Sequence, residues 1–140
     1  VVDIDVDIRT VPGTSRADVD DLLRDALGDL FHRVDVTVLQ QSDATSSDHG
    51  PGNALWETVA KHTQVAYPGA ELVPGLIVGG TDARFYRERG VTAYGTGLFS
   101  PSMDLATFGS RFHGNDERVD VDSLGLSTNF FHGIARDLVG

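Results

Sequence analysis

Residues 2–9 read Val-Asp-Ile-Asp-Val-Asp-Ile-Arg, and this stretch sets the expected fold. Apolar and charged residues alternate strictly, and a period of two residues is typical of a β-strand with one buried face and one wet face. The three aspartates share a face without converging on a point, so we interpret them as solvated residues rather than as a cation site. The stretch predicts a half-buried strand at the start of the fold.

A helix and a second strand are expected next. A Val-Pro-Gly break follows the first strand, and Thr14 or Ser15 is a suitable N-cap for a helix. Apolar residues then recur at i, i+3, i+4 and i+7, which predicts an amphipathic helix over residues 15–30. Valines alternate with polar residues over 34–38 and indicate a second strand. Residues 1–41 therefore predict a β-α-β unit.

The remaining chain has the pattern of an α/β domain. Residues 42–52 are rich in Ser, Asp, Thr, Gly and Pro and predict a hinge. Beyond it, the expected elements are helices over 53–66, 83–89 and 122–139 and strands over 73–78 and 91–94. The run at 73–78 is continuously apolar, as in strands covered on both faces. The predicted fold class is α/β, with a mixed sheet in a second domain over 53–140.

Composition narrows the possible partners. The 140 residues carry a net charge of -10, from 21 acidic and 11 basic residues, which disfavours nucleic acid and anionic membrane surfaces as partners. No apolar run approaches the roughly 20 residues that cross a bilayer, and no signal peptide is evident at the N-terminus. We therefore expect a cytoplasmic protein. The absence of cysteine leaves the redox compartment open.

A glycine turn, Gly-Gly-Thr-Asp-Ala-Arg-Phe at 79–85, follows the predicted strand at 73–78. It matches neither nucleotide-binding glycine pattern and contains no lysine for a phosphate, so nucleotide binding is not expected. It places Thr81, Asp82 and Arg84 where open α/β sheets bind ligands. Arg84 is either a carboxylate-binding residue or an ion-pair partner of Asp82, and the sequence does not decide between them.

A second polar turn, His-Gly-Asn-Asp-Glu-Arg-Val at 113–119, follows a long loop expected over 97–112. A neutral imidazole is a common metal ligand, and nearby carboxylates can hold its other N–H group. His113 is therefore a candidate metal ligand, with Asp116 and Glu117 beside it. The alternative is an ordinary hydrogen-bonded surface histidine.

Both turns, in this order and followed by a terminal helix, resemble the C-terminal half of the M20 metallopeptidases. This family includes acetylornithine deacetylase, succinyl-diaminopimelate desuccinylase, carboxypeptidase G and aminoacylase. The segment Asp-Ile-Arg-Thr-Val-Pro-Gly at 7–13 is similar to a strand exit in the lid domain of that family. The resemblance implies that 1–41 is the second half of a lid or dimerisation domain and that 53–140 belongs to a two-zinc catalytic domain.

The same resemblance implies roles for single residues. His113 corresponds to the last zinc ligand, and Thr81, Asp82 and Arg84 correspond to part of the substrate pocket. Asp116 and Glu117 then orient the ligand or shape its loop.

The family's other zinc ligands and its catalytic glutamate have no counterpart in this sequence. A zinc site needs three or four ligands, so we expect a C-terminal fragment of a zinc-dependent amide hydrolase that is inactive alone. Its expected substrate is a small amino-acid amide or peptide, of unspecified identity, and its expected partner is a second copy joined through the lid strands. The alternative is a non-enzymatic acidic module for dimerisation or small-ligand binding.

Overall fold

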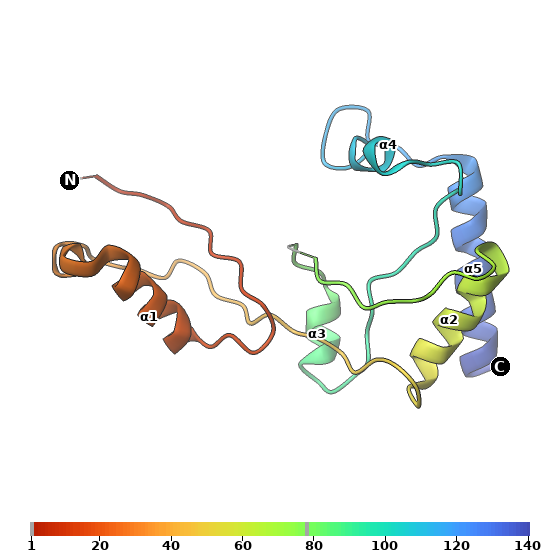
Figure 1. Cartoon of the computed structure of the whole chain (residues 1–140), viewed down its shortest axis with the longest axis horizontal. Helices are drawn as coiled ribbons and strands as arrows, with labels where there is room; N and C mark the ends of the chain where they lie inside the picture. Colours follow the sequence, from red (N-terminus) through yellow and green to blue (C-terminus); the bar gives the residue numbers. More distant parts are fainter. Residues whose placement is uncertain (1, 78) are drawn as a thin grey trace. The chain divides into compact units, whose positions relative to one another are not determined.

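A computed structural model describes residues 2–77 and 79–140 (Figure 1). Their regular elements, in chain order, are α1 (Arg16–Leu27), the 3₁₀-helix η1 (Gly28–Arg33), α2 (Ala54–Ala66), α3 (Ala83–Arg87), α4 (Leu105–Gly109) and α5 (Val121–Val139). The chain divides into two compact units. The first unit comprises Val1–Ser47 and Ile77–Ala93, and the second comprises Asp48–Leu76 and Tyr94–Gly140. No helix in the described residues has both the length and the apolar character needed to span a membrane.

The predicted α/β fold is wrong, because the described residues contain helices and no β-strand. The segments 2–9, 34–38, 73–77 and 91–94 run without regular secondary structure, and no β-ladder joins described residues; Val78, the last residue of one predicted strand, lies outside the described residues. Alternation of apolar and polar residues indicates which side chains of an extended segment would share one face of a sheet. A β-strand also needs hydrogen bonds to the backbone of a neighbouring strand, which alternation does not identify. The apolar row of the first segment is therefore exposed, with Ile4 78% and Val6 69% accessible.

Helix α1 forms for the local reasons that its sequence indicates. The Ser15 hydroxyl accepts the backbone N–H of Asp18 at 3.2 Å, and the Asp18 carboxylate accepts the backbone N–H of Ser15 at 2.8 Å, which completes a capping box. Arg16 and Asp20 form an i, i+4 ion pair of 2.6 Å. The helix ends at Gly28, where φ is +49°. The expected apolar stripe covers no sheet, and no residue of α1 is buried.

Arg87 of α3 forms hydrogen bonds to other segments of the first unit. Arg87 Nε donates to the Ala93 carbonyl at 2.8 Å, and Arg87 Nη1 donates to the Thr45 carbonyl at 3.3 Å. The Ser47 hydroxyl also bonds to both backbone groups of Ala93, at 3.0 and 3.2 Å. These bonds join α3 to the chain on either side of it.

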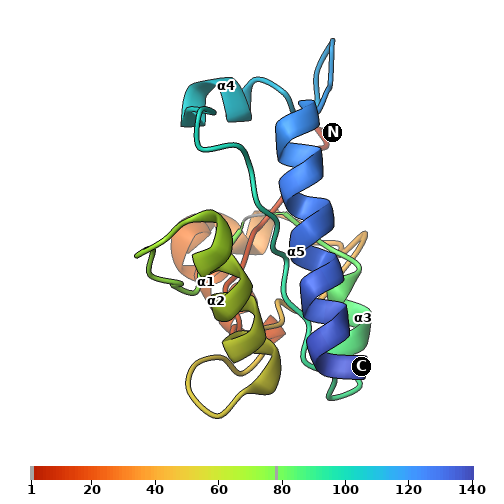
Figure 2. The same ribbon diagram turned by 90° about the vertical axis from the view of Figure 1, so that its right-hand side faces the viewer.

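The second unit has a core between α2 and α5, which lie side by side in Figures 1 and 2. Val59 of α2 is 3% exposed, and Phe130 and Ile134 of α5 are 2% and 8% exposed; Leu98 completes the buried cluster. Phe130 and Ile134 lie four residues apart and therefore share the buried face of α5. The predicted helices over 53–66 and 122–139 are confirmed, to within one residue at each end.

Two serines on one face of α5 hold the segment 98–100 against the helix. Ser123 Oγ accepts the backbone N–H of Ser100 at 2.8 Å, and Ser127 Oγ donates to the Leu98 carbonyl at 2.7 Å. Ser123 is almost fully buried, and its hydroxyl also donates to Asp120 at 2.8 Å. Backbone groups that a sheet would satisfy are satisfied here by side chains.

Candidate functional site

The first group of predicted site residues lies at the start of α3. The Thr81 carbonyl accepts the backbone N–H of Arg84 at 3.2 Å, and Asp82 stands at the N-cap without a side-chain capping bond. Among the described residues Asp82 and Arg84 form no ion pair; the Arg84 guanidinium instead lies 4.7 Å from the centre of the Phe85 ring. The guanidinium is therefore available to an anion.

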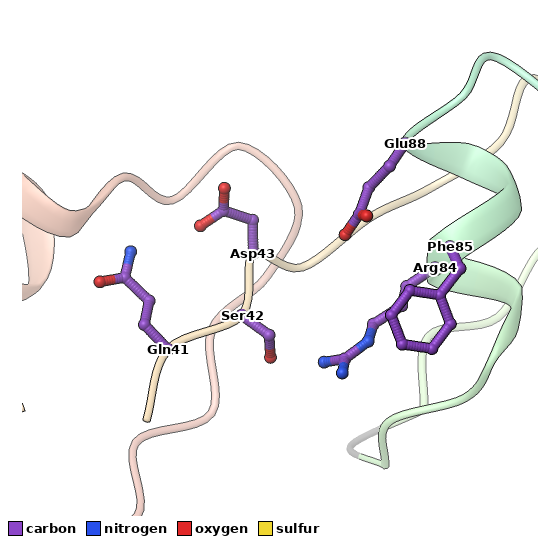
Figure 3. A pocket seen from close by; sticks show the side chains of 6 residues that line it. All are labelled: Gln41, Ser42, Asp43, Arg84, Phe85 and Glu88. Atoms are coloured by element: carbon purple, nitrogen blue, oxygen red, sulfur yellow. The ribbon is translucent and has the colours of Figure 1, made fainter. Parts of the chain in front are cut away.

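Arg84 faces a cavity of about 430 Å³ within the first unit (Figure 3). The other lining residues are Gln41, Ser42 and Asp43 from the chain after η1, and Phe85 and Glu88 from α3 and its end. The figure shows the Arg84 side chain extending toward the segment 41–43. The cavity combines one cation with two carboxylates, so a carboxylate ligand bound there would meet attraction from Arg84 and repulsion from Asp43 and Glu88.

The second group lies in the turn between α4 and α5. His113 and Asp116 both adopt the left-handed region, with φ of +56° and +61°. Non-glycine residues visit this region infrequently, although His, Asn and Asp do so more often than others. Both side chains and that of Glu117 are exposed. The Arg118 side chain steadies the turn by donating to the Asp116 carbonyl at 2.7 Å.

The donor set near His113 does not fit zinc by itself. Zinc sites use three or four Cys, His, Asp or Glu ligands, and the described residues contain no group of three such side chains that could hold a metal ion. Thr81, Asp82 and Arg84 belong to the first unit, whereas His113, Asp116 and Glu117 belong to the second. Neither unit contains all six residues.

An aromatic cavity of about 330 Å³ lies beside the turn at 113–119, called the histidine turn below. This cavity was not predicted from the sequence. The Phe108 ring packs edge-on against Phe99 and against Phe112, with centroid distances of 4.4 and 4.5 Å. Arg111, Glu117 and Arg118 line the same cavity. The available signal was the occurrence of three phenylalanines, at 99, 108 and 112, within fourteen residues.

Helix α4 places Phe108 in that cavity, within a segment predicted to be a loop. Its N-cap is Asp104, whose carboxylate accepts the backbone N–H of Thr107 at 2.7 Å. This backbone hydrogen bond holds the pKa of Asp104 below its usual value, with a further contribution from the Thr107 hydroxyl. An Asp-x-x-Thr sequence of this kind is a recognisable helix start.

Arg111, which lines the aromatic cavity, forms a half-buried ion pair with Asp120. Arg111 Nη1 lies 2.7 Å from Asp120 Oδ2, and Asp120 is the N-cap of α5. The pKa of Asp120 is lowered mainly by hydrogen bonds from the Ser123 backbone and hydroxyl, and also by Arg111. Asp120 therefore caps α5 from the position directly before the helix begins. The Nε atom of Arg111 is buried and has no hydrogen-bond partner among the described residues.

A third polar cluster joins α2 to α5. Lys61 Nζ and His62 Nε2 lie 2.7 and 2.8 Å from the same atom, Asp137 Oδ2. Lys61 and then His62 lower the pKa of Asp137 by hydrogen bonding to its charged form. His62 is half-buried against α5. The cluster contains one carboxylate and lines neither cavity, so we interpret it as a helix-helix contact.

Comparison of this chain with protein-family models, curated proteins and solved structures gave no match.

Proposed function

We propose that the chain contributes His113 as one metal ligand, and Thr81, Asp82 and Arg84 as part of a substrate pocket, to an M20-type zinc-dependent amide hydrolase. The two sequence turns support this function, and one structural observation carries it. The exposed His113 imidazole stands in a left-handed turn beside Asp116 and Glu117, and neither ring nitrogen bonds to a described residue. A nitrogen with a free lone pair is what a metal requires.

Zinc binding in such an enzyme would need ligands other than the described residues. We therefore expect the chain by itself to hydrolyse no peptide and to bind zinc weakly. Asp116 and Glu117 supply negative charge near the imidazole, which favours an approaching cation. The proposed substrate is a small amino-acid amide or peptide, and Arg84 would bind its carboxylate through the planar guanidinium. Such an enzyme would be cytoplasmic.

The metal role of His113 is tested by nuclear magnetic resonance with Co²⁺ as a paramagnetic probe. The chain has five histidines, so four of them serve as internal controls. We expect the His113 ring signals to broaden at a lower Co²⁺ concentration than those of the other four. Asp116→Asn should reduce that preference by removing a neighbouring negative charge. Equal broadening of all five rings would contradict a metal role for His113.

The exposed apolar rows favour a second candidate function, a non-enzymatic dimerisation module. Ile4 and Val6 are largely exposed, and residues 2–8 form no β-ladder with other described residues. Unpaired extended segments readily pair with another chain. The partner in this alternative is a second copy of the chain.

Sedimentation equilibrium tests the dimer, with Val6→Asp as the informative variant. Because Val6 is exposed in the chain as described, an aspartate there should leave the folded monomer intact and weaken association. Ala17→Asp, at an exposed position on α1, is a control of equal charge change. A wild-type chain that remains monomeric at all concentrations would rule out this alternative.

A further inference from the structure

We propose that the aromatic cavity of the second unit binds a free amino acid with a large apolar side chain. The cavity is open to solvent on one side and is lined by residues of α4, of the turn after it and of the segment before it. Its apolar wall consists of Phe99, Met103, Phe108, Phe112 and Val119. A volume of about 330 Å³ is at the small end of the usual range for ligand pockets, roughly 300–1,000 Å³. The site therefore fits a ligand the size of one amino acid.

The arrangement of the rings favours an aromatic or bulky aliphatic group. Phe108 meets Phe99 and Phe112 at interplanar angles of 74° and 63°, so ring edges and faces alternate along the wall. A further ring can join such a series with an edge against a face, the preferred geometry for aromatic pairs. Met103 adds a flexible thioether that adapts to the shape of the ligand.

Two oppositely charged side chains of the cavity match the two charges of an amino acid. Arg118 and Glu117 both line the cavity, and neither forms an ion pair with a described residue. Arg118 uses Nη1 to bond to the Asp116 carbonyl, which leaves its other N–H groups for a carboxylate. Glu117 can accept hydrogen bonds from an ammonium group.

Arg111 has a different role from Arg118 in this cavity. Its charge is already paired with Asp120, but its Nε–H is buried and lacks a partner among the described residues. A buried donor without a partner is unfavourable, and a ligand oxygen or a bridging water would satisfy it. A ligand with only a carboxylate would leave Glu117 without a partner of opposite charge. A ligand with only an ammonium group would leave Arg118 without one. An amino acid satisfies both charges.

Binding at this cavity requires no metal and no residue of the first unit. The Phe112 ring lies 6.4 Å from the His113 ring, centroid to centroid. The proposal does not depend on the hydrolase function, because the cavity uses neither Arg84 nor His113. If that function is wrong, the cavity still binds the free amino acid.

The test is isothermal titration of the metal-free chain with four probes: L-phenylalanine, 3-phenylpropionate, 2-phenylethylamine and glycine. We expect L-phenylalanine to bind about tenfold more tightly than either single-charge analogue, because each analogue lacks one of the two charged groups. A tenfold difference in affinity corresponds to about 1.4 kcal/mol. Glycine, which lacks the ring, should show no binding. Equal binding of 3-phenylpropionate and L-phenylalanine, or no binding of L-phenylalanine, would overturn the proposal.

Two variants assign the charges. Arg118→Gln should weaken L-phenylalanine and 3-phenylpropionate but not 2-phenylethylamine, and Glu117→Gln should weaken L-phenylalanine and 2-phenylethylamine but not 3-phenylpropionate. Arg136→Gln is the control, because Arg136 is exposed on α5 and does not line the cavity. A similar loss of affinity in Arg136→Gln would overturn the assignment.

The folding of each variant is checked by its thermal unfolding midpoint. If Arg118→Gln lowers the midpoint, Arg118→Lys replaces it, since lysine keeps the charge but loses the planar fork. We expect Arg118→Lys to retain part of the affinity for L-phenylalanine. Complete retention in a folded Arg118→Gln chain would exclude Arg118 from the site.

Discussion

The imidazole of His62 lies directly against the backbone of Gly133, where α2 and α5 meet. A Cβ atom on Gly133 would lie 2.5 Å from His62 Nδ1 and 3.1 Å from His62 Nε2, and closer still to Cε1. The ring cannot simply turn away, because its Nε2 is 2.8 Å from Asp137 Oδ2. The absence of a side chain at Gly133 thus allows the two helices their close approach.

Gly133→Ala should therefore destabilise the second unit. Overpacking of this kind costs about 1–3 kcal/mol, and the better helix propensity of alanine returns only about 1 kcal/mol. We expect the variant to have a lower free energy of unfolding, measured by urea titration of the fluorescence of Trp56, the single tryptophan.

Gly125→Ala is the matched control in the same helix. A Cβ at Gly125 would meet no atom within 4 Å, so only the propensity gain of about 1 kcal/mol applies. Unfolding should become less favourable in this variant. If both alanine variants changed stability in the same direction, the contact between His62 and Gly133 would not be the cause.

The stability of the contact between α2 and α5 should depend on pH through Asp137. Its pKa is lower in the folded chain than in the unfolded chain, because Lys61 and His62 bond to the charged carboxylate. Its contribution is therefore complete above the unfolded pKa, about 3.9, and is lost as the pH falls through the lower folded pKa.

Asp137→Asn isolates this contribution. The wild-type chain should be more stable than Asp137→Asn at pH 6, and the difference should shrink as the pH is lowered from 5 to 2. Urea unfolding at a series of pH values measures it. A difference that is independent of pH across this range would show that the charge of Asp137 does not matter.

His113→Gly should not destabilise the chain, in spite of the loss of a side chain. The His113 backbone has φ of +56°, a region that glycine adopts without steric cost. Relief of the strain is worth about 1 kcal/mol, partly offset by the greater freedom of glycine in the unfolded chain. His113→Val, with a β-branched residue at the same φ, should be clearly less stable. Thermal unfolding compares the two variants.

The proposed binding of an anion by Arg84 is opposed by the negative charges of Asp43 and Glu88 in the same cavity. Arg84→Gln should weaken binding of N-acetylglycine to the cavity of the first unit, and Glu88→Gln should strengthen it by removing a repulsive charge. Arg33→Gln, which replaces an exposed arginine outside the cavity, is the control. Chemical shifts of residues 41–43 report the binding. Unchanged affinity in Arg84→Gln would remove Arg84 from the proposed pocket.

The sequence predicted the helices better than any other part of the fold, because their causes are local. The capping box of α1 involves only Ser15 and Asp18, three residues apart. The buried face of α5 likewise follows from residues within that one helix, such as Phe130 and Ile134. The predicted strands were wrong because a strand depends on a distant partner that alternation does not identify. The short helix α4 was missed although Asp104 marks its start.

The site was predictable only in part, for a related reason. The turn that contains His113 and the start of α3 at Ala83 both depend on residues close in sequence. The partnership of His62 with Asp137 spans 75 positions, and the aromatic cavity draws on residues from Phe99 to Val119. Such contacts depend on packing between elements, which periodicity alone does not specify.

The absence of a β-ladder over the described residues 2–8 divides the amide protons of the chain into two populations. Amides within α2 and α5 are hydrogen-bonded around a buried core and should exchange with deuterium only when that core opens. Amides of 2–8 have no ladder to other described residues and should exchange at nearly the rate of a free peptide. Protection that appears in this segment only as protein concentration rises would therefore be a direct signature of a second backbone laid beside it.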